Sequence, residues 1–228
     1  MTANPNLGAV ELAAASLGDL TQDLVLMGGC AVGLLITDTA RAPVRQTIDV
    51  DLITAVTPIA SYYELCEQLR RFGFSEQPTD DVIVRWAKDT LLIDVVPADQ
   101  AVLGFTNSWY GAAAQNSETY LLPSGRSIRL ITAPYFLATK LEAFRSRGGG
   151  DYIHHDMEDI VTVIDGRTTV VDEVLASDEE VRLFLMDEFE ALLADPTFVD
   201  RLAWLLSPSE LETRRPIVLH RMQRIAGL

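Results

Sequence analysis

The sequence predicts an α+β (mixed α/β) protein in which a mixed-sheet domain, residues 1–132, is followed by a helical C-terminal domain, residues 133–228. Up to about residue 132, two patterns alternate along the chain. In some short segments every second residue is apolar, as in a strand, and in others the apolar residues have the spacing of a helix. After Pro134, every apolar pattern has the helical period. The length of 228 residues is enough to bury the core of one large domain or two small ones.

The first domain is predicted to mix strands and helices, because its breaks carry turn residues. The pair Gly28-Gly29 ends one strand, Pro58 suits a first helical turn, and Ser124-Gly125 suits a hairpin. Residues 104–117 are expected to form a polar loop that contains aromatic residues. Strands are expected at 24–27, 47–54, 82–86, 91–96, 119–122 and 127–131, and helices at 9–17, 30–36 and 58–72.

The second domain is predicted to be entirely helical. Its large aromatic residues fall at helical spacings, which is typical of core positions. They are Phe136, Phe144, Phe184, Phe189 and Trp204, and the helices are expected at 134–147, 152–164, 178–193, 197–206 and 208–226.

The composition indicates a globular protein, with 48% hydrophobic and 22% charged residues. Cys30 and Cys66 lie in apolar stretches, so we expect buried, reduced thiols. The longest apolar run, residues 24–36, contains three glycines and is too short to span a bilayer. With no signal-peptide pattern at residues 1–20, we expect a cytoplasmic protein that has no membrane partner.

The charge of the chain counts against broad nucleic-acid binding. Against 18 basic residues stand 33 acidic ones, so the net charge of −15 would repel a polyanion over most of the surface. Basic residues are nevertheless concentrated at 126–147 and 201–228, where they could serve phosphates.

Gly28 and Gly29 lie between a predicted strand and a predicted helix. Backbone N–H groups at such a junction, together with the helix N-terminus, can bind a phosphate, and glycine permits its close approach. Taken alone, two glycines at a strand end more often form an ordinary turn.

Asp49 and Asp51 lie two positions apart on a predicted strand, so their carboxylates face the same side, roughly 7 Å apart along the backbone. At that separation two like charges repel by roughly 2 kcal/mol. A divalent cation would relieve this repulsion, whereas a fully hydrated edge strand is the alternative explanation.

Asp94 is the one acidic residue in the apolar strand 91–96, where an unpaired carboxylate is disfavoured. If this strand lies beside the strand that carries Asp49 and Asp51, three carboxylates converge. Carboxylate oxygens are the ligands that Mg²⁺ or Mn²⁺ requires. The sequence thus predicts a site for divalent cations, with Asp94 also able to accept a proton.

The segments Leu26-Met27-Gly28-Gly29-Cys30 and Thr47-Ile48-Asp49-Val50-Asp51 resemble the glycine pair and Asp-x-Asp signature of the polymerase-beta-like nucleotidyltransferase superfamily. The later segments Ala138-Thr139-Lys140-Leu141 and Asp156-Met157-Glu158-Asp159 are similar to those of its AbiEii and MenT type members, the toxins of type IV toxin-antitoxin systems. The resemblance covers residues 22–165. It departs from the family at Cys30, where many members have Ser or Thr.

The resemblance implies transfer of a nucleoside monophosphate from an NTP to an acceptor hydroxyl, with RNA such as a tRNA 3′ end as acceptor and an antitoxin protein as partner. Lys140 would bind phosphate, and Asp156 and Asp159 would orient the nucleotide or assist the acceptor. Nineteen residues between Gly29 and Asp49 suggest a loop from which Arg41 and Arg45 reach the triphosphate. The implied catalytic residues are Asp49, Asp51, Asp94, Lys140 and Asp159.

Other functions were weighed against this one. His154, His155 and Asp156 resemble part of an HD-type phosphohydrolase site, but the chain has only one further histidine, His220. An inactive fold that serves as a binding surface, or transfer to a small molecule or a protein hydroxyl, is the alternative. Trp109 and Tyr110 could stack on a base, but the sequence favours packing against the helical domain.

Overall fold

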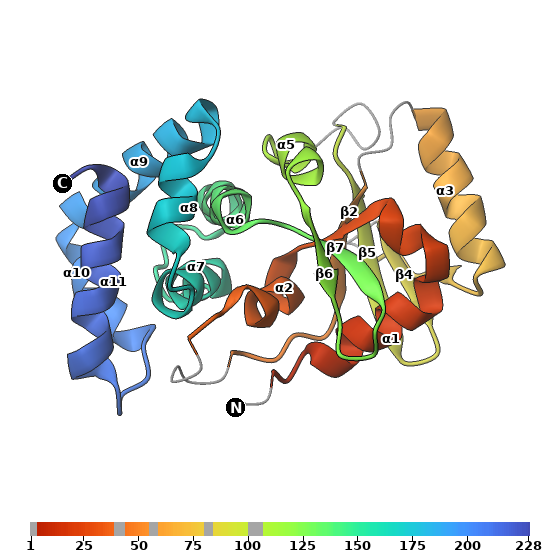
Figure 1. The fold of residues 1–228 in the computed structure, drawn as a ribbon, viewed down its shortest axis with the longest axis horizontal. Coiled ribbons are helices and arrows are strands. Elements are labelled where there is room, and N and C mark those ends of the chain that lie inside the picture. Colours follow the sequence, from red (N-terminus) through yellow and green to blue (C-terminus); the bar gives the residue numbers. More distant parts are fainter. Residues whose placement is uncertain (1–3, 39–43, 55–58, 80–83, 100–106) are drawn as a thin grey trace. The chain divides into compact units, whose positions relative to one another are not determined.

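The computed structural model of the chain describes residues 4–38, 44–54, 59–79, 84–99 and 107–228 (Figure 1). The chain forms two compact units. The sheet unit comprises the described parts of Asn4–Gly33 and Arg45–Thr132, and the helical unit those of Leu34–Val44 and Ala133–Leu228. The predicted division at 132/133 coincides with one of their boundaries, but the segment Leu34–Val44 belongs to the helical unit. Among the described helices, none is both long enough and apolar enough to cross a membrane.

The sheet unit is built on one mixed sheet of seven strands in the order β3-β4-β5-β2-β1-β7-β6. At its centre β2 runs parallel to β5 and antiparallel to β1, and β1 runs parallel to β7. The strands are β1 (Leu24–Leu26), β2 (Val50–Thr54), β3 (Ser75–Glu76), β4 (Arg85–Lys88), β5 (Leu91–Pro97), β6 (Glu118–Leu121) and β7 (Ser127–Leu130).

Apolar residues of the central strands form the core of this unit. Val25, Ile53, Ile93 and Val95 are completely buried, as expected for strands that are covered on both faces. Helix α1 (Leu7–Leu17) packs against β2 and β5, and α3 (Ile59–Arg71) belongs to the same unit. Helix α2 (Gly28–Leu35) follows β1 directly, and α5 (Tyr110–Gln115) contacts β2.

The helical unit packs α6 (Ala133–Arg147) against α7, α8 and α9, while α11 contacts α7, α8 and α9. Phe136, Phe189 and Phe198 are completely buried in its core. The remaining helices are α7 (His155–Gly166), α8 (Val170–Ala176), α9 (Glu179–Ala194), α10 (Pro196–Arg201) and α11 (Leu211–Ala226).

The structure confirms the predicted fold class and corrects several elements. Residues 110–115, predicted as part of a loop, form α5, and the strand predicted at 47–54 begins only at Val50. Helix α8 was not predicted at all. Trp204, predicted as core, is 71% exposed because α10 ends at Arg201 and a short 3₁₀ turn follows it.

Candidate functional site

The sheet register aligns Asp51, Asp94 and Arg85 across three neighbouring strands. Asp51 of β2 pairs with Asp94 of the parallel strand β5, and Asp94 pairs on its other side with Arg85 of β4. Paired residues of adjacent strands point to the same face of the sheet. The two acid-bearing strands are therefore neighbours, as the sequence suggested, and their carboxylates share a face.

Gly28 lies in close contact with Asp51. A Cβ atom added at Gly28 would lie only 1.8 Å from Oδ2 of Asp51, and the φ angle of Gly28 is +64°. The backbone N–H of Met27 donates to the carbonyl of Asp51, with an N–O distance of 2.9 Å. Only glycine fits here, and the turn that precedes α2 is held directly beside an acidic side chain.

Asp49 lies just before β2 and is held by two side chains that the sequence analysis did not assign. The Thr47 hydroxyl lies 3.0 Å from the Asp49 carbonyl oxygen and 3.2 Å from its Oδ1. The Cys30 thiol donates to the same carbonyl, with an S–O distance of 3.3 Å. Burial raises the pKa of the Cys30 thiol to about 12, with Asp51 and Asp49 adding to the effect, so the thiol stays protonated as a hydrogen-bond donor.

Arg85 lies between two of the predicted metal ligands. Its Nε and Nη2 atoms donate to Oδ1 and Oδ2 of Asp94 over 2.8 and 2.7 Å, and the same Nη2 contacts Oδ2 of Asp49. The hydrogen bond with Asp94 raises the pKa of the Arg85 guanidinium above its ordinary value, although burial opposes it. Arg85 was not predicted from the sequence, because its pairing with Asp94 depends on the register of β4 and β5.

Arg45 reaches the glycine turn. A Cβ atom on Gly29 would lie 3.0 Å from Nη2 of Arg45 and 3.1 Å from the Thr47 methyl group. The predicted contact of Arg45 with a nucleotide stays a prediction, and Arg41 lies outside the described residues.

Lys140, Asp156 and Asp159 meet in the helical unit. The Lys140 ammonium lies 2.9 Å from Oδ1 of Asp156 and 2.8 Å from Oδ2 of Asp159, and all three side chains are buried. Burial alone would lower the pKa of Lys140, but the two carboxylates outweigh it and the pKa is raised. The structure thus joins these predicted residues into a buried ionic cluster, and their nucleotide-binding role stays a prediction.

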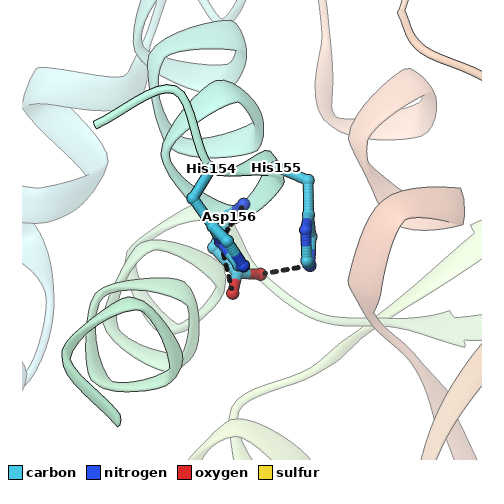
Figure 2. A group of neighbouring side chains, drawn as sticks. All are labelled: His154, His155 and Asp156. Atoms are coloured by element: carbon cyan, nitrogen blue, oxygen red, sulfur yellow. Dashed lines mark hydrogen bonds and ion pairs between the residues drawn. The ribbon is translucent and has the colours of Figure 1, made fainter. Parts of the chain in front are cut away.

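A second potential metal site lies at the start of α7. Figure 2 shows His154, His155 and Asp156 gathered there. Each offers one potential metal ligand, a ring nitrogen or a carboxylate oxygen, and these three atoms lie within 4.8 Å of one another. Among the described residues, no other group of His, Cys, Asp or Glu side chains does so. The Asp156 carboxylate, however, already accepts from Lys140 and from two nitrogens of Arg147. His154 Nδ1 accepts the N–H of Asp156. These bonds occupy the Asp156 oxygens and His154 Nδ1 and place two positively charged side chains beside Asp156, which disfavours a cation.

The aspartates of the sheet are the other candidate ligands for a divalent cation. Asp49 and Asp94 both contact Nη2 of Arg85, so a positively charged group lies between these two carboxylates. Asp51 is partly exposed on the same face, next to Gly28. The donor atoms are carboxylate oxygens, which suit Mg²⁺ or Mn²⁺. Unlike His154, His155 and Asp156, these three aspartates do not form a group with ligand atoms within 4.8 Å of one another among the described residues.

Neither a family model nor any curated protein matches this sequence. Solved structures do. The crystal structure of an antigenic nucleotidyltransferase-like protein from Paracoccidioides brasiliensis has a TM-score of 0.53 at 19% identity, and the match covers 89% of this chain and 94% of that one. This chain has a nucleotidyltransferase-like fold. A structure from H. pylori, described as a probable member of the nucleotidyltransferases, has a TM-score of 0.49 at 14% identity, covers 99% and 96% of the two chains, and adds no weight.

The nucleotidyltransferase-like fold places the glycine turn and the acid-bearing strands β2 and β5 on one sheet. At 19% identity the likeness establishes the fold alone.

Proposed function

We propose that the chain is a metal-dependent nucleotidyltransferase that moves a nucleoside monophosphate from an NTP to an acceptor hydroxyl. The observation that carries the proposal is the alignment of Asp51 with Asp94 beside the Gly28 turn, with Asp49 close enough to share Arg85 with Asp94. Carboxylates on adjacent strands next to a phosphate-binding turn are the components that this reaction needs.

Each group has a separate role in the proposed reaction. Gly28 and Gly29 present backbone N–H groups and the N-terminus of α2 to the triphosphate, and Arg45 adds positive charge beside Gly29. Asp49, Asp51 and Asp94 hold Mg²⁺ or Mn²⁺, which would supply charge neutralisation at the α-phosphate and the leaving pyrophosphate. Asp94 takes the proton of the acceptor hydroxyl as the new P–O bond forms and the bond to pyrophosphate breaks.

Pyrophosphate release tests this proposal. The protein would be incubated with each of the four NTPs and a hydroxyl-bearing acceptor pool, with Mg²⁺, Mn²⁺ or EDTA, alongside Asp51→Asn. We expect release that needs the cation and falls by at least about a hundredfold in the variant. Release that is unchanged in EDTA, or unchanged in Asp51→Asn, would refute it.

We further propose that the acceptor is RNA, such as a tRNA 3′ end, and that the protein is a cytoplasmic toxin with an antitoxin partner. The motif around Lys140 and Asp156 supports this. The second candidate is a small-molecule or protein hydroxyl, which the net charge of −15 favours because it repels a polyanion. Transfer of label from α-labelled NTP to RNA, weakening steeply with salt, would distinguish them, as would growth arrest that Asp49→Ala relieves.

A further inference from the structure

Arg85 fills the space between two carboxylates that are needed for cation binding. It donates to both oxygens of Asp94 through two nitrogens, and one of these nitrogens also contacts Asp49. The Arg85 side chain is 19% exposed and that of Asp94 only 8%. A bidentate pair of this geometry is strong and well oriented.

The same oxygens cannot serve Arg85 and a divalent cation together without cost. The lone pairs that accept from the guanidinium are the ones that a cation would use, and two positive groups at this distance repel each other. The guanidinium of arginine stays protonated in proteins, so Arg85 can release the two carboxylates only by moving away from them. Arg85 is the first residue of β4, and its side chain is partly exposed to solvent, so it can move outward.

Building on the proposed metal-dependent function, we propose that Arg85 is a displaceable counter-cation. It holds Asp49 and Asp94 together while divalent cations are absent, and it leaves them when a cation binds. Arg85 therefore stabilises the metal-free protein and weakens cation binding. Once released, its guanidinium carries a positive charge beside the acids, where a nucleotide phosphate can accept it.

Mn²⁺ titration, followed by the electron paramagnetic resonance signal of free Mn²⁺, tests this inference. The variants are Arg85→Met, which keeps the length of the side chain but removes its charge and donors, and Arg126→Met, an exposed arginine of the same unit. The second variant controls for the loss of one positive charge. We expect Arg85→Met to bind Mn²⁺ at least about tenfold more tightly than the wild type. Arg126→Met should bind as the wild type does.

Thermal unfolding gives an independent readout. Without cations, Arg85→Met should unfold at a lower temperature than Arg126→Met, and saturating Mn²⁺ should raise its Tm by more than it raises that of the wild type. Equal or weaker Mn²⁺ binding by Arg85→Met would overturn the displacement while leaving the metal site in place. Absence of Mn²⁺ binding in every variant would overturn the proposed metal site, and the displacement with it.

If Arg85→Met does not fold, the wild-type protein still tests the inference. The Nε–H resonance of Arg85, assigned with Arg85→Lys, should be protected from exchange in EDTA because it is bonded to Asp94. Saturating Mg²⁺ should abolish that protection. Protection that persists with Mg²⁺ bound would refute the displacement.

Discussion

Gly28 and Asp51 are in such close contact that a Cβ atom on Gly28 would lie 1.8 Å from the Asp51 carboxylate oxygen. Gly28 also has a φ of +64°, which other residues rarely adopt. The Asp51 carboxylate therefore occupies the space that a side chain at residue 28 would need. Under the proposed function, a phosphate bound at the turn would lie beside a cation bound at Asp51.

Gly28→Ala is predicted to abolish activity, because the added methyl group must push Asp51 away. Displacement by about 1 Å can reduce turnover by a hundredfold or more. Gly125→Ala is the matched control, since Gly125 has a φ of +83° in the same unit with nothing within 4 Å of an added Cβ. Pyrophosphate release and thermal unfolding should be measured for both. A Gly28→Ala protein as active as Gly125→Ala would contradict the role of the contact with Asp51.

Lys140→Met is predicted to destabilise the protein by about 3–5 kcal/mol, because it leaves the buried carboxylates of Asp156 and Asp159 without their shared cation. Lys88→Met provides the control, as Lys88 is the other lysine of the chain and its contact with Phe72 is exposed. That change should cost no more than about 0.5 kcal/mol. Urea unfolding measures both, and a Lys140→Met protein as stable as Lys88→Met would contradict the buried cluster.

Asp156 is predicted to make stability fall in acid. Burial would raise its pKa, but the hydrogen bond from Arg147 and the charge of Lys140 outweigh burial and hold the pKa below its ordinary value. The resulting stability is fully present above the unfolded value of about 3.9 and is lost as the pH falls further. Urea unfolding between pH 7 and 3 should show this loss in the wild type and in Asp172→Asn, whose carboxylate is 79% exposed. A wild-type curve that stays flat below pH 4 would contradict it.

Cys30 is predicted to resist alkylation in the folded protein. With a pKa of about 12, roughly one thiol in ten thousand is ionised at pH 8, and only the thiolate reacts readily. Iodoacetamide followed by peptide mass analysis should leave Cys30 unmodified until a denaturant unfolds the chain. Rapid modification of the native protein at pH 8 would show that the thiol is not held against the Asp49 carbonyl.

The sequence predicted the parts of the fold that local patterns determine. Helix α6 was expected at 134–147 and lies at Ala133–Arg147, and the hairpin at Ser124-Gly125 pairs β6 with β7 as expected. The local sequence pattern did not predict elements whose conformation depends on tertiary packing. The Ala-rich segment of α5 follows a buried Trp109, and its helix could not be distinguished from a loop by periodicity.

The acidic residues of the candidate site could be predicted from the sequence, but the side chains that bind them could not. A lone acid within an apolar strand, such as Asp94, is conspicuous in the sequence. The partner Arg85 depends on the antiparallel register of β4 and β5, and Thr47 depends on the bend before Asp49. Neither the strand register nor the bend produces a periodic pattern in the sequence. Lys140 was expected to bind phosphate from motif resemblance alone, which carries no information about its burial between two aspartates.

The central claim is that Asp49, Asp51 and Asp94 hold divalent cations for nucleotidyl transfer. The most direct measurement is the anomalous scattering of Mn²⁺ in crystals of the wild-type protein grown with a non-hydrolysable NTP analogue. We predict Mn²⁺ peaks within about 2.0–2.3 Å of oxygens of these three aspartates, with the triphosphate against Gly28 and Gly29. Mn²⁺ found instead at His154, His155 and Asp156, or a nucleotide bound with no Mn²⁺ at the sheet, would contradict the account.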